Sequence, residues 1–195
     1  MNFQTHFHRF LLLFMLFLFA CEQRKNARAI LHTSMGEIRV QLFDSIPWHR
    51  DNFLSSLHRA SADTLICYRV ERDFAIQFGP PPEKALPENA LKAEIEAPIR
   101  GGALVAALAG QNNLSDGAGF FIAMDHPQTD ASLDAIEKKQ NLHFTPEERN
   151  IYKKYGGLPQ LHGQYAVFGQ VTEGMDVAQK IAALPSDANG WPFQR

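Results

Sequence analysis

Cysteine is scarce in this sequence of 195 residues, which holds only Cys21 and Cys67. Two cysteines cannot build the disulfide framework that supports a small secreted domain. An excess of positive charge is also missing, because the formal net charge is −2, and this argues against a nucleic-acid-binding surface. The eight histidines show no metal-ligand spacing, so we expect no metal site.

The apolar run at the N-terminus is too short to span a membrane. It extends from Phe10 to Ala20 behind Arg9, which suits the core of a signal peptide. Its end, Leu18-Phe19-Ala20-Cys21, resembles the lipobox of bacterial lipoproteins, in which cleavage leaves the cysteine to carry the lipid. A diacylated cysteine holds a domain on a membrane without a spanning helix.

We therefore expect a signal peptide over residues 1–20, lipidation at Cys21 and a polar tether over residues 21–28. The expected location is the periplasmic side of a bacterial cell envelope. Two alternatives are a plain secretory signal, which would leave the protein free in the periplasm, and a short hydrophobic anchor. Cys67 then has no intrachain partner, and its apolar surroundings predict a small buried hydrophobe.

The remaining residues, 29–195, predict one domain in which strands dominate. The length allows a single full hydrophobic core. Alternating apolar residues on both sides of Met35-Gly36 indicate a hairpin. Ser45 and Pro47 suit the start of a helix. Further strands are expected at about 65–70 and 74–78, within 101–109, at FFIAM and at QYAVFGQV, with turn-rich loops between them and a last helix at about 175–184.

Residues 125–157 differ from the rest because they are charged and helical in propensity. Thr145 and Glu148 form a capping box, with Pro146 at the first helical position. We predict an insertion of one or two helices that ends at Gly156-Gly157. The insert is either a solvated cap or a partner-binding surface, and its charge pattern favours the cap.

Six motifs, in this order along the chain, resemble the cyclophilins. They are TSMGEIRVQLF, PWHRDNFLSSL, YRVERDFAIQFG, LVAALAG, GFFIAM and LHGQYAVFGQVTEGMDVAQKI, and they extend from about residue 30 to about residue 190. Cyclophilins are peptidyl-prolyl cis-trans isomerases. The resemblance implies a mainly β fold, a closed antiparallel barrel capped by two α-helices with an inserted helical segment at about 125–157. It also implies rotation of X-Pro bonds without a cofactor, and the insert resembles that of a bacterial subgroup.

The resemblance also implies the site. Arg69 takes the place of the catalytic arginine, and Gln77 that of the glutamine that hydrogen-bonds both the substrate and the arginine. The substrate-binding positions are Phe74, Ala75, Ala107, Leu108, Phe121, Leu161 and Tyr165.

Some positions depart from the family pattern. Ala75 stands where the family has methionine, Leu108 where it has asparagine, Gly119 where it has glutamine and Tyr165 where it has histidine. The sequence also stops at Arg195, where relatives continue into a last strand that closes the barrel, which leaves either a truncated sequence or an open seam.

Three hypotheses follow. The first is a monomeric, envelope-anchored isomerase that acts on proline-containing segments of exported proteins and assists their folding. The second is a cyclophilin-shaped module that binds such segments without useful turnover, which Ala75 and Gly119 favour. The third is a structural lipoprotein without a peptide site. An arginine in an amphipathic strand usually faces solvent. Arg69 therefore supports the first hypothesis only together with neighbouring residues that match the family's site.

Overall fold

The computed structural model describes residues 27–59, 65–79, 91–92, 94, 97–109 and 114–193. The expected signal peptide and Cys21 lie outside these residues. The first strand already begins at Arg28, the last residue of the expected tether. Within the described part of the chain, no helix is long and apolar enough to span a membrane.

The N-terminal hairpin joins β1 (Arg28–Thr33) to β2 (Gly36–Leu42) and confirms the prediction around Met35-Gly36. Thr33 closes the turn: its hydroxyl donates to the Gly36 carbonyl at 2.7 Å and accepts from the Met35 N–H at 3.1 Å. Alternate residues of β2 are buried, so one face of the hairpin forms part of the core.

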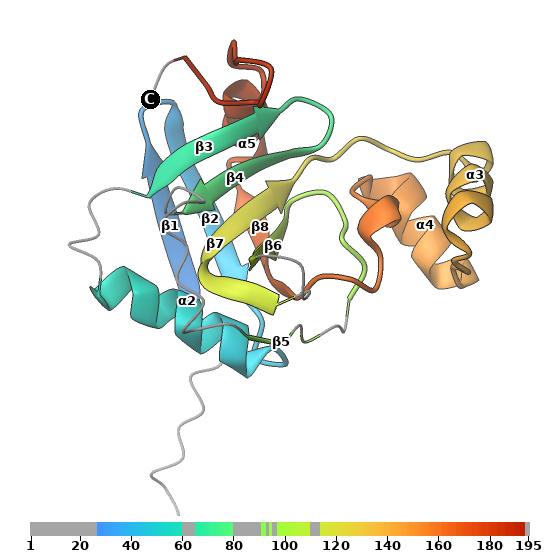
Figure 1. The fold of residues 1–195 in the computed structure, drawn as a ribbon, viewed down its shortest axis with the longest axis horizontal. Helices are drawn as coiled ribbons and strands as arrows, with labels where there is room; N and C mark the ends of the chain where they lie inside the picture. The colour runs from blue at the N-terminus through green and yellow to red at the C-terminus, as the bar shows by residue number, and fades with distance from the viewer. Residues whose placement is uncertain are drawn as a thin grey trace, which may run out of the picture.

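The strands form one antiparallel sheet in the order β1-β2-β8-β6-β7-β4-β3, and the short β5 (Leu91–Lys92) pairs with β7. The sheet curls around its inner face (Figure 1). The remaining strands are β3 (Ile66–Glu71), β4 (Ala75–Gly79), β6 (Ala103–Ala109), β7 (Leu114–Ala123) and β8 (Val167–Glu173).

The mainly β architecture is confirmed, but the closure expected of the barrel needs correction. No pairing joins β1 to β3 within the described residues, so the sheet is curled and open between these two strands. β7 also begins at Leu114, inside a stretch whose Asn, Gly and Ser residues predicted a loop, because this part of β7 pairs with β6 and β5.

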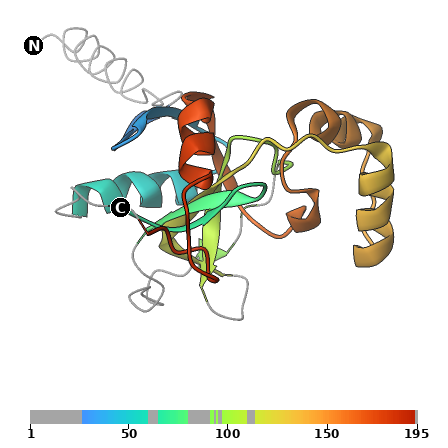
Figure 2. The same cartoon turned by 90° about the horizontal axis from the view of Figure 1, so that it is seen from above.

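Two helices pack on the sheet. α2 (Pro47–Arg59) begins at Pro47, as predicted, and packs on β7 and β8. α5 (Met175–Ala182) packs on β2, β3 and β4 (Figure 2). The buried residues of α5 are Val177, Ala178, Ile181 and Ala182, the apolar stripe of an amphipathic helix.

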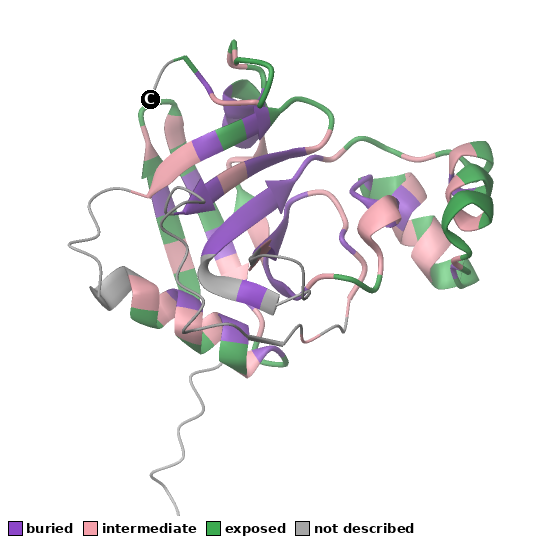
Figure 3. Ribbon diagram, viewed as in Figure 1, coloured by how far each residue is buried: buried purple, intermediate pink, exposed green. Residues whose placement is uncertain are grey.

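The inner core is centred on the ring of Phe120 in β7. This ring lies 5.3 Å from both Phe53 of α2 and Phe78 of β4, and 6.3 Å from Phe168 of β8. Figure 3 shows β4 and β7 as largely buried, whereas α3 carries many exposed residues. The aromatic core therefore joins three strands to α2.

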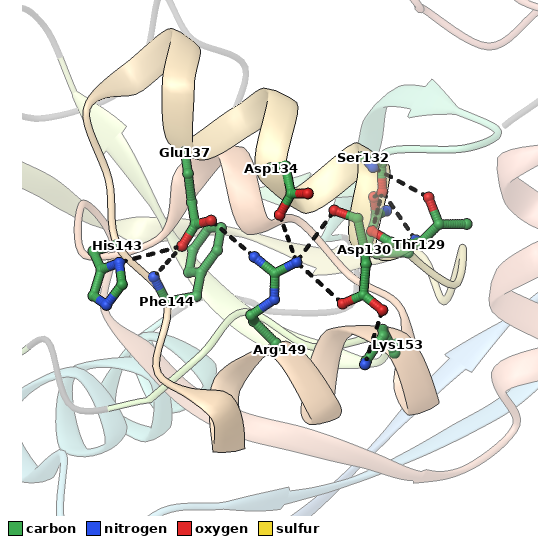
Figure 4. A network of polar contacts seen from close by, with 10 residues as sticks. Thr129, Asp130, Ser132, Asp134, Glu137, His143, Phe144, Arg149 and Lys153 are labelled. Atoms are coloured by element: carbon green, nitrogen blue, oxygen red, sulfur yellow. Dashed lines mark hydrogen bonds and ion pairs between the residues drawn. The ribbon is translucent and has the colours of Figure 1, made fainter.

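The helical insert is confirmed as two helices, α3 (Asp130–Gln140) and α4 (Pro146–Tyr155), which lie together at one side of the sheet (Figures 1 and 2). The capping box of Thr145 and Glu148 is present. Arg149 of α4 bridges to α3 through the acidic side chains of Asp130, Asp134 and Glu137 (Figure 4).

A tight turn at the C-terminal end of the described chain lies along the outer edge of β3. Asp187 organises this turn by accepting the backbone N–H groups of Asn189 and Trp191 on Oδ1, at 2.9 and 2.8 Å. The carbonyl of Gly190 then accepts the Val70 N–H at 2.8 Å. The turn therefore supplies a hydrogen-bond acceptor to the edge of β3 that does not pair with β4.

Candidate active site

The outer face of the sheet carries a second apolar cluster, separate from the inner core. We call it the outer cluster. Of the nine sequence-predicted site residues, five belong to it or pack against it. They are Ala75 and Phe121, which are buried, and Phe74, Leu161 and Tyr165, which are partly buried.

A β-bulge in β3 places Arg69 on this outer face. Cys67 pairs with Phe78, whereas Arg69 pairs with Gln77, so Tyr68 is the extra residue of the bulge. Cys67 packs against the inner core. Strict alternation would return the side chain two residues later to the same inner face, and the extra residue prevents this. The bulge therefore moves the guanidinium out of the core and beside Gln77.

The strand register aligns the main predicted residues. Arg69 of β3 is opposite Gln77 of β4, and Gln77 is opposite Phe121 of β7. Residues directly opposite one another on neighbouring strands project from the same face. The guanidinium, the amide and the aromatic ring thus form a row across three strands.

The guanidinium of Arg69 lies between a ring and a carboxylate. Its Cζ is 5.7 Å from the centroid of the Phe74 ring, within cation–π range. Its Nη2 donates to Glu71 Oε2 at 2.8 Å, in a pair whose side chains are 44% and 52% exposed. Glu71 was not predicted, although opposite charges two residues apart on one strand are a readable signal. An exposed pair of this kind is worth roughly 0–1 kcal/mol, so a ligand can displace the carboxylate at little cost.

Aromatic and aliphatic side chains form the far wall of the outer cluster. The Phe121 and Tyr165 rings meet edge to face, with centroids 5.6 Å apart at 80°. Leu161 ends a short 3₁₀ helix, η3 (Pro159–Leu161). The chain reaches η3 by passing close over Ile99: a Cβ on Gly157, whose φ is +115°, would lie 2.1 Å from the Ile99 carbonyl oxygen.

Ala107 and Leu108 lie on β6, next to the outer cluster but outside it. The ladder with β7 is irregular here, since Ala106 pairs with Phe120 whereas Leu108 pairs with Ser115. Ala107 is buried and Leu108 partly buried. The structure thus brings together seven predicted residues around Arg69 and Phe121 and leaves these two on the adjoining strand.

The site offers hydrogen-bond donors beside apolar surface and no reactive thiol. Burial raises the pKa of the Cys67 thiol to about 11, so it is protonated at neutral pH. Across the described ranges, no group of three or more His, Cys, Asp or Glu side chains is placed to hold a metal ion. Such a surface can bind an extended peptide and present a guanidinium to one of its amide groups.

The family is shown by a direct match. The model of the family described as "Cyclophilin type peptidyl-prolyl cis-trans isomerase/CLD" matches residues 28–195. This match covers most of the sequence, so the chain belongs to the cyclophilin-type peptidyl-prolyl cis-trans isomerases, a family of isomerases.

Curated relatives and solved structures agree with this assignment. A Staphylococcus epidermidis protein is 26% identical over 178 residues, covering 87% of this chain and 88% of the relative. A Staphylococcus aureus protein is 26% identical over 168 residues, covering 82% and 83%. Both carry the name "Putative peptidyl-prolyl cis-trans isomerase".

Among solved structures, a Cryptosporidium parvum cyclophilin-type isomerase is similar in fold. It has a TM-score of 0.61 and 22% identity, over 86% of this chain and 91% of that chain. A second structure of that protein, solved in the presence of the dipeptide Ala-Pro, has a TM-score of 0.62, also at 22% identity, over 86% and 92%.

Proposed function

We propose that this protein catalyses the cis-trans rotation of X-Pro bonds in extended segments of exported proteins, with Arg69 as the catalytic residue. The alignment of Arg69, Gln77 and Phe121 across three strands is the observation that supports this most strongly. The Ala-Pro dipeptide present with the related Cryptosporidium protein suggests the same class of ligand here.

The proposed chemistry follows from the nature of the amide bond. Rotation about a peptide bond has a barrier of about 18–20 kcal/mol because of amide resonance. A proline ring resting on Phe121, between Leu161 and Tyr165, would lose water from around its amide. The guanidinium of Arg69 would donate to the proline nitrogen as that atom becomes pyramidal, which weakens the resonance. Arginine suits this role because it stays charged and holds its donors in a rigid plane.

Gln77 and Glu71 would orient the reacting groups. Gln77 lies between Arg69 and Phe121 in the register, so its amide can hydrogen-bond both the peptide and the guanidinium. Glu71 accepts a hydrogen bond from the guanidinium at 2.8 Å and so orients it until the peptide displaces the carboxylate. Ala107 and Leu108 would contact the residues that precede proline, because β6 lies beside the outer cluster.

Exchange NMR on a short Ala-Pro peptide tests the proposal. Arg69→Ala should lower the exchange rate by about 10²–10³-fold, the effect of removing one positioned donor. The matched control is Arg72→Ala, which removes an exposed arginine from the adjoining turn and should leave the rate unchanged. Equal rates for native protein and Arg69→Ala, at matched peptide occupancy, would refute the catalytic role.

A second candidate function is binding without useful turnover. The ion pair between Arg69 and Glu71 favours it, because the catalytic donor already has a partner in the free protein. Ala75 also favours it, since a small side chain leaves the wall of the outer cluster less filled. This module predicts peptide-dependent chemical shifts at Phe121 without faster exchange, whereas the enzyme predicts both.

For the location, we propose an anchor on the periplasmic side of the envelope through lipid on Cys21, after removal of residues 1–20. The sequence Leu18-Phe19-Ala20-Cys21 supports this. Intact-mass measurement of membrane-extracted protein should show an acylated cysteine, and Cys21→Ser should abolish the added mass. Unmodified mature protein recovered in the soluble periplasmic fraction would favour the plain secretory signal.

A further inference from the structure

The helical insert contacts the outer cluster through His162, which directly follows Leu161. The hydroxyl of Tyr152 on α4 lies 3.0 Å from His162 Nδ1. On the other side of the ring, Glu148 Oε1 lies 3.4 Å from Nε2. The imidazole also packs edge to face with Phe144, with ring centroids 5.3 Å apart at 89°. The insert therefore contacts both nitrogens of this ring and packs a phenyl ring against it.

The Tyr152 hydroxyl is held in a buried position beside His162. Burial raises the pKa of this phenol, and a hydrogen bond from the backbone of Ile99 opposes the rise. A phenol hydroxyl can both donate and accept, and an imidazole nitrogen does either according to the tautomer, so the contact with Nδ1 forms a hydrogen bond in either direction. In both cases α4 is linked to the residue that follows Leu161.

The element that carries Leu161 has little stability of its own. η3 is a single 3₁₀ turn, with the Leu161 N–H donating to Leu158 at 3.0 Å and the His162 N–H donating to Pro159 at 3.1 Å. Such short turns have poor hydrogen-bond geometry. On the other side, a Cβ added to Gly163 would meet no atom within 4 Å, so nothing packs on the loop there. The turn also packs against α3 and buries Pro159, so the link from His162 to α4 adds a polar restraint on the side of Leu161.

We propose that His162 is a positioning residue for the isomerase site, held by Tyr152 and Glu148 so that the helical insert braces the Leu161 wall. This inference rests on the proposed function, since the braced wall is the surface on which the proline ring would lie. The insert thereby acts on the reaction without touching the peptide.

Two faces of α4 make separate contacts, one with α3 and one with His162. Arg149 and Lys153 face α3 and hold the insert together through Asp130 and other acids (Figure 4). Glu148 and Tyr152, four residues apart and thus on one side of the helix, face His162. The contact with His162 can therefore be removed while the contacts between α3 and α4 stay in place.

The test compares two variants that each lose one hydroxyl from α4. Tyr152→Phe removes the hydroxyl that hydrogen-bonds His162 and keeps the buried ring. Tyr155→Phe, on an exposed side chain of the same helix, is the matched control. We expect Tyr152→Phe to shift the Leu161 methyl signals and the His162 Nδ1 resonance, and to lower kcat/KM on an Ala-Pro peptide about five-fold, as for one lost hydrogen bond. Tyr155→Phe should do neither.

A second pair of variants uses rescue to separate positioning from general folding. His162→Asn keeps a hydrogen-bonding group near the position of Nδ1 and should retain most of the activity, whereas His162→Leu should lose as much as Tyr152→Phe. Identical kcat/KM values and Leu161 shifts for Tyr152→Phe and Tyr155→Phe would overturn the positioning role of His162.

The experiments distinguish failure of the proposed function from failure of the positioning role of His162. If the native protein binds the peptide without accelerating exchange, the enzymatic function is refuted. The positioning role is then tested by the peptide dissociation constants of the same variants. Native protein that neither binds nor isomerises the peptide would refute both the enzymatic function and the positioning role of His162.

Discussion

Phe120 and Phe121 are neighbours on β7 whose side chains serve opposite faces of the sheet, so they form a matched pair for a substitution test. Phe120 is 1% exposed and contacts three other rings, whereas Phe121 contacts the ring of Tyr165. Each aromatic pair is worth about 0.5–1.5 kcal/mol beyond its buried area. Replacing Phe120 by Leu should therefore cost about 3 kcal/mol of unfolding free energy, and Phe121→Leu about 1 kcal/mol.

For a chain of this length, 1 kcal/mol lowers Tm by about 2–4 °C. Thermal unfolding should show a fall of roughly 6–12 °C for Phe120→Leu and roughly 2–4 °C for Phe121→Leu. Titration with an Ala-Pro peptide should give the opposite ranking. Phe121→Leu should weaken binding about ten-fold, or about 1.4 kcal/mol, and Phe120→Leu should stay within about two-fold. The same ranking in both assays would refute the assignment of the two faces.

Further predictions concern the close approach of Gly157 and the partly buried thiol of Cys67. In urea unfolding, Gly157→Ala should lower the free energy of unfolding by at least about 2–3 kcal/mol, because its Cβ would meet the Ile99 oxygen at 2.1 Å. Gly163→Ala should lower it by only about 1–2 kcal/mol, the cost of its positive φ. Equal losses for the two variants would contradict the close contact. In a Cys21→Ser background, Cys67 should react with iodoacetamide at pH 8 about two orders of magnitude more slowly in the native than in the unfolded state, because burial raises its pKa to about 11. Labelling should accelerate with rising pH, and a native rate close to the unfolded rate would show that the thiol is accessible.

Features specified by neighbouring residues were predicted well. The Thr145 capping box and the hairpin turn at Met35 depend on contacts within three residues, so the sequence pattern contains them. The capping box of Thr129 and Ser132 was missed, because serine at the third helical position is a weaker signal than glutamate. The start of β7 was missed because pairing with β6 overrides the turn propensity of its residues.

Features that depend on distant residues could not be predicted in this way. The resemblance supplied Arg69 and Phe121, but the row they form needs the strand order, in which β4 lies between β3 and β7. The turn that brings Gly190 to β3 joins residues far apart in the chain. The contact of His162 with Tyr152 likewise depends on how α4 packs against η3.

The bulge at Tyr68 lets β3 carry one residue more than its pairing needs, because Cys67 and Arg69 on either side of it keep successive partners on β4. Removing residue 68 would close the bulge and leave both pairings in place, so the guanidinium would stay on the outer face. What the deletion would remove is a buried ring that packs beside Trp191 of the C-terminal turn. A one-residue gap here in a related sequence would therefore be compatible with an arginine on the outer face, and its cost would appear in the stability of that turn.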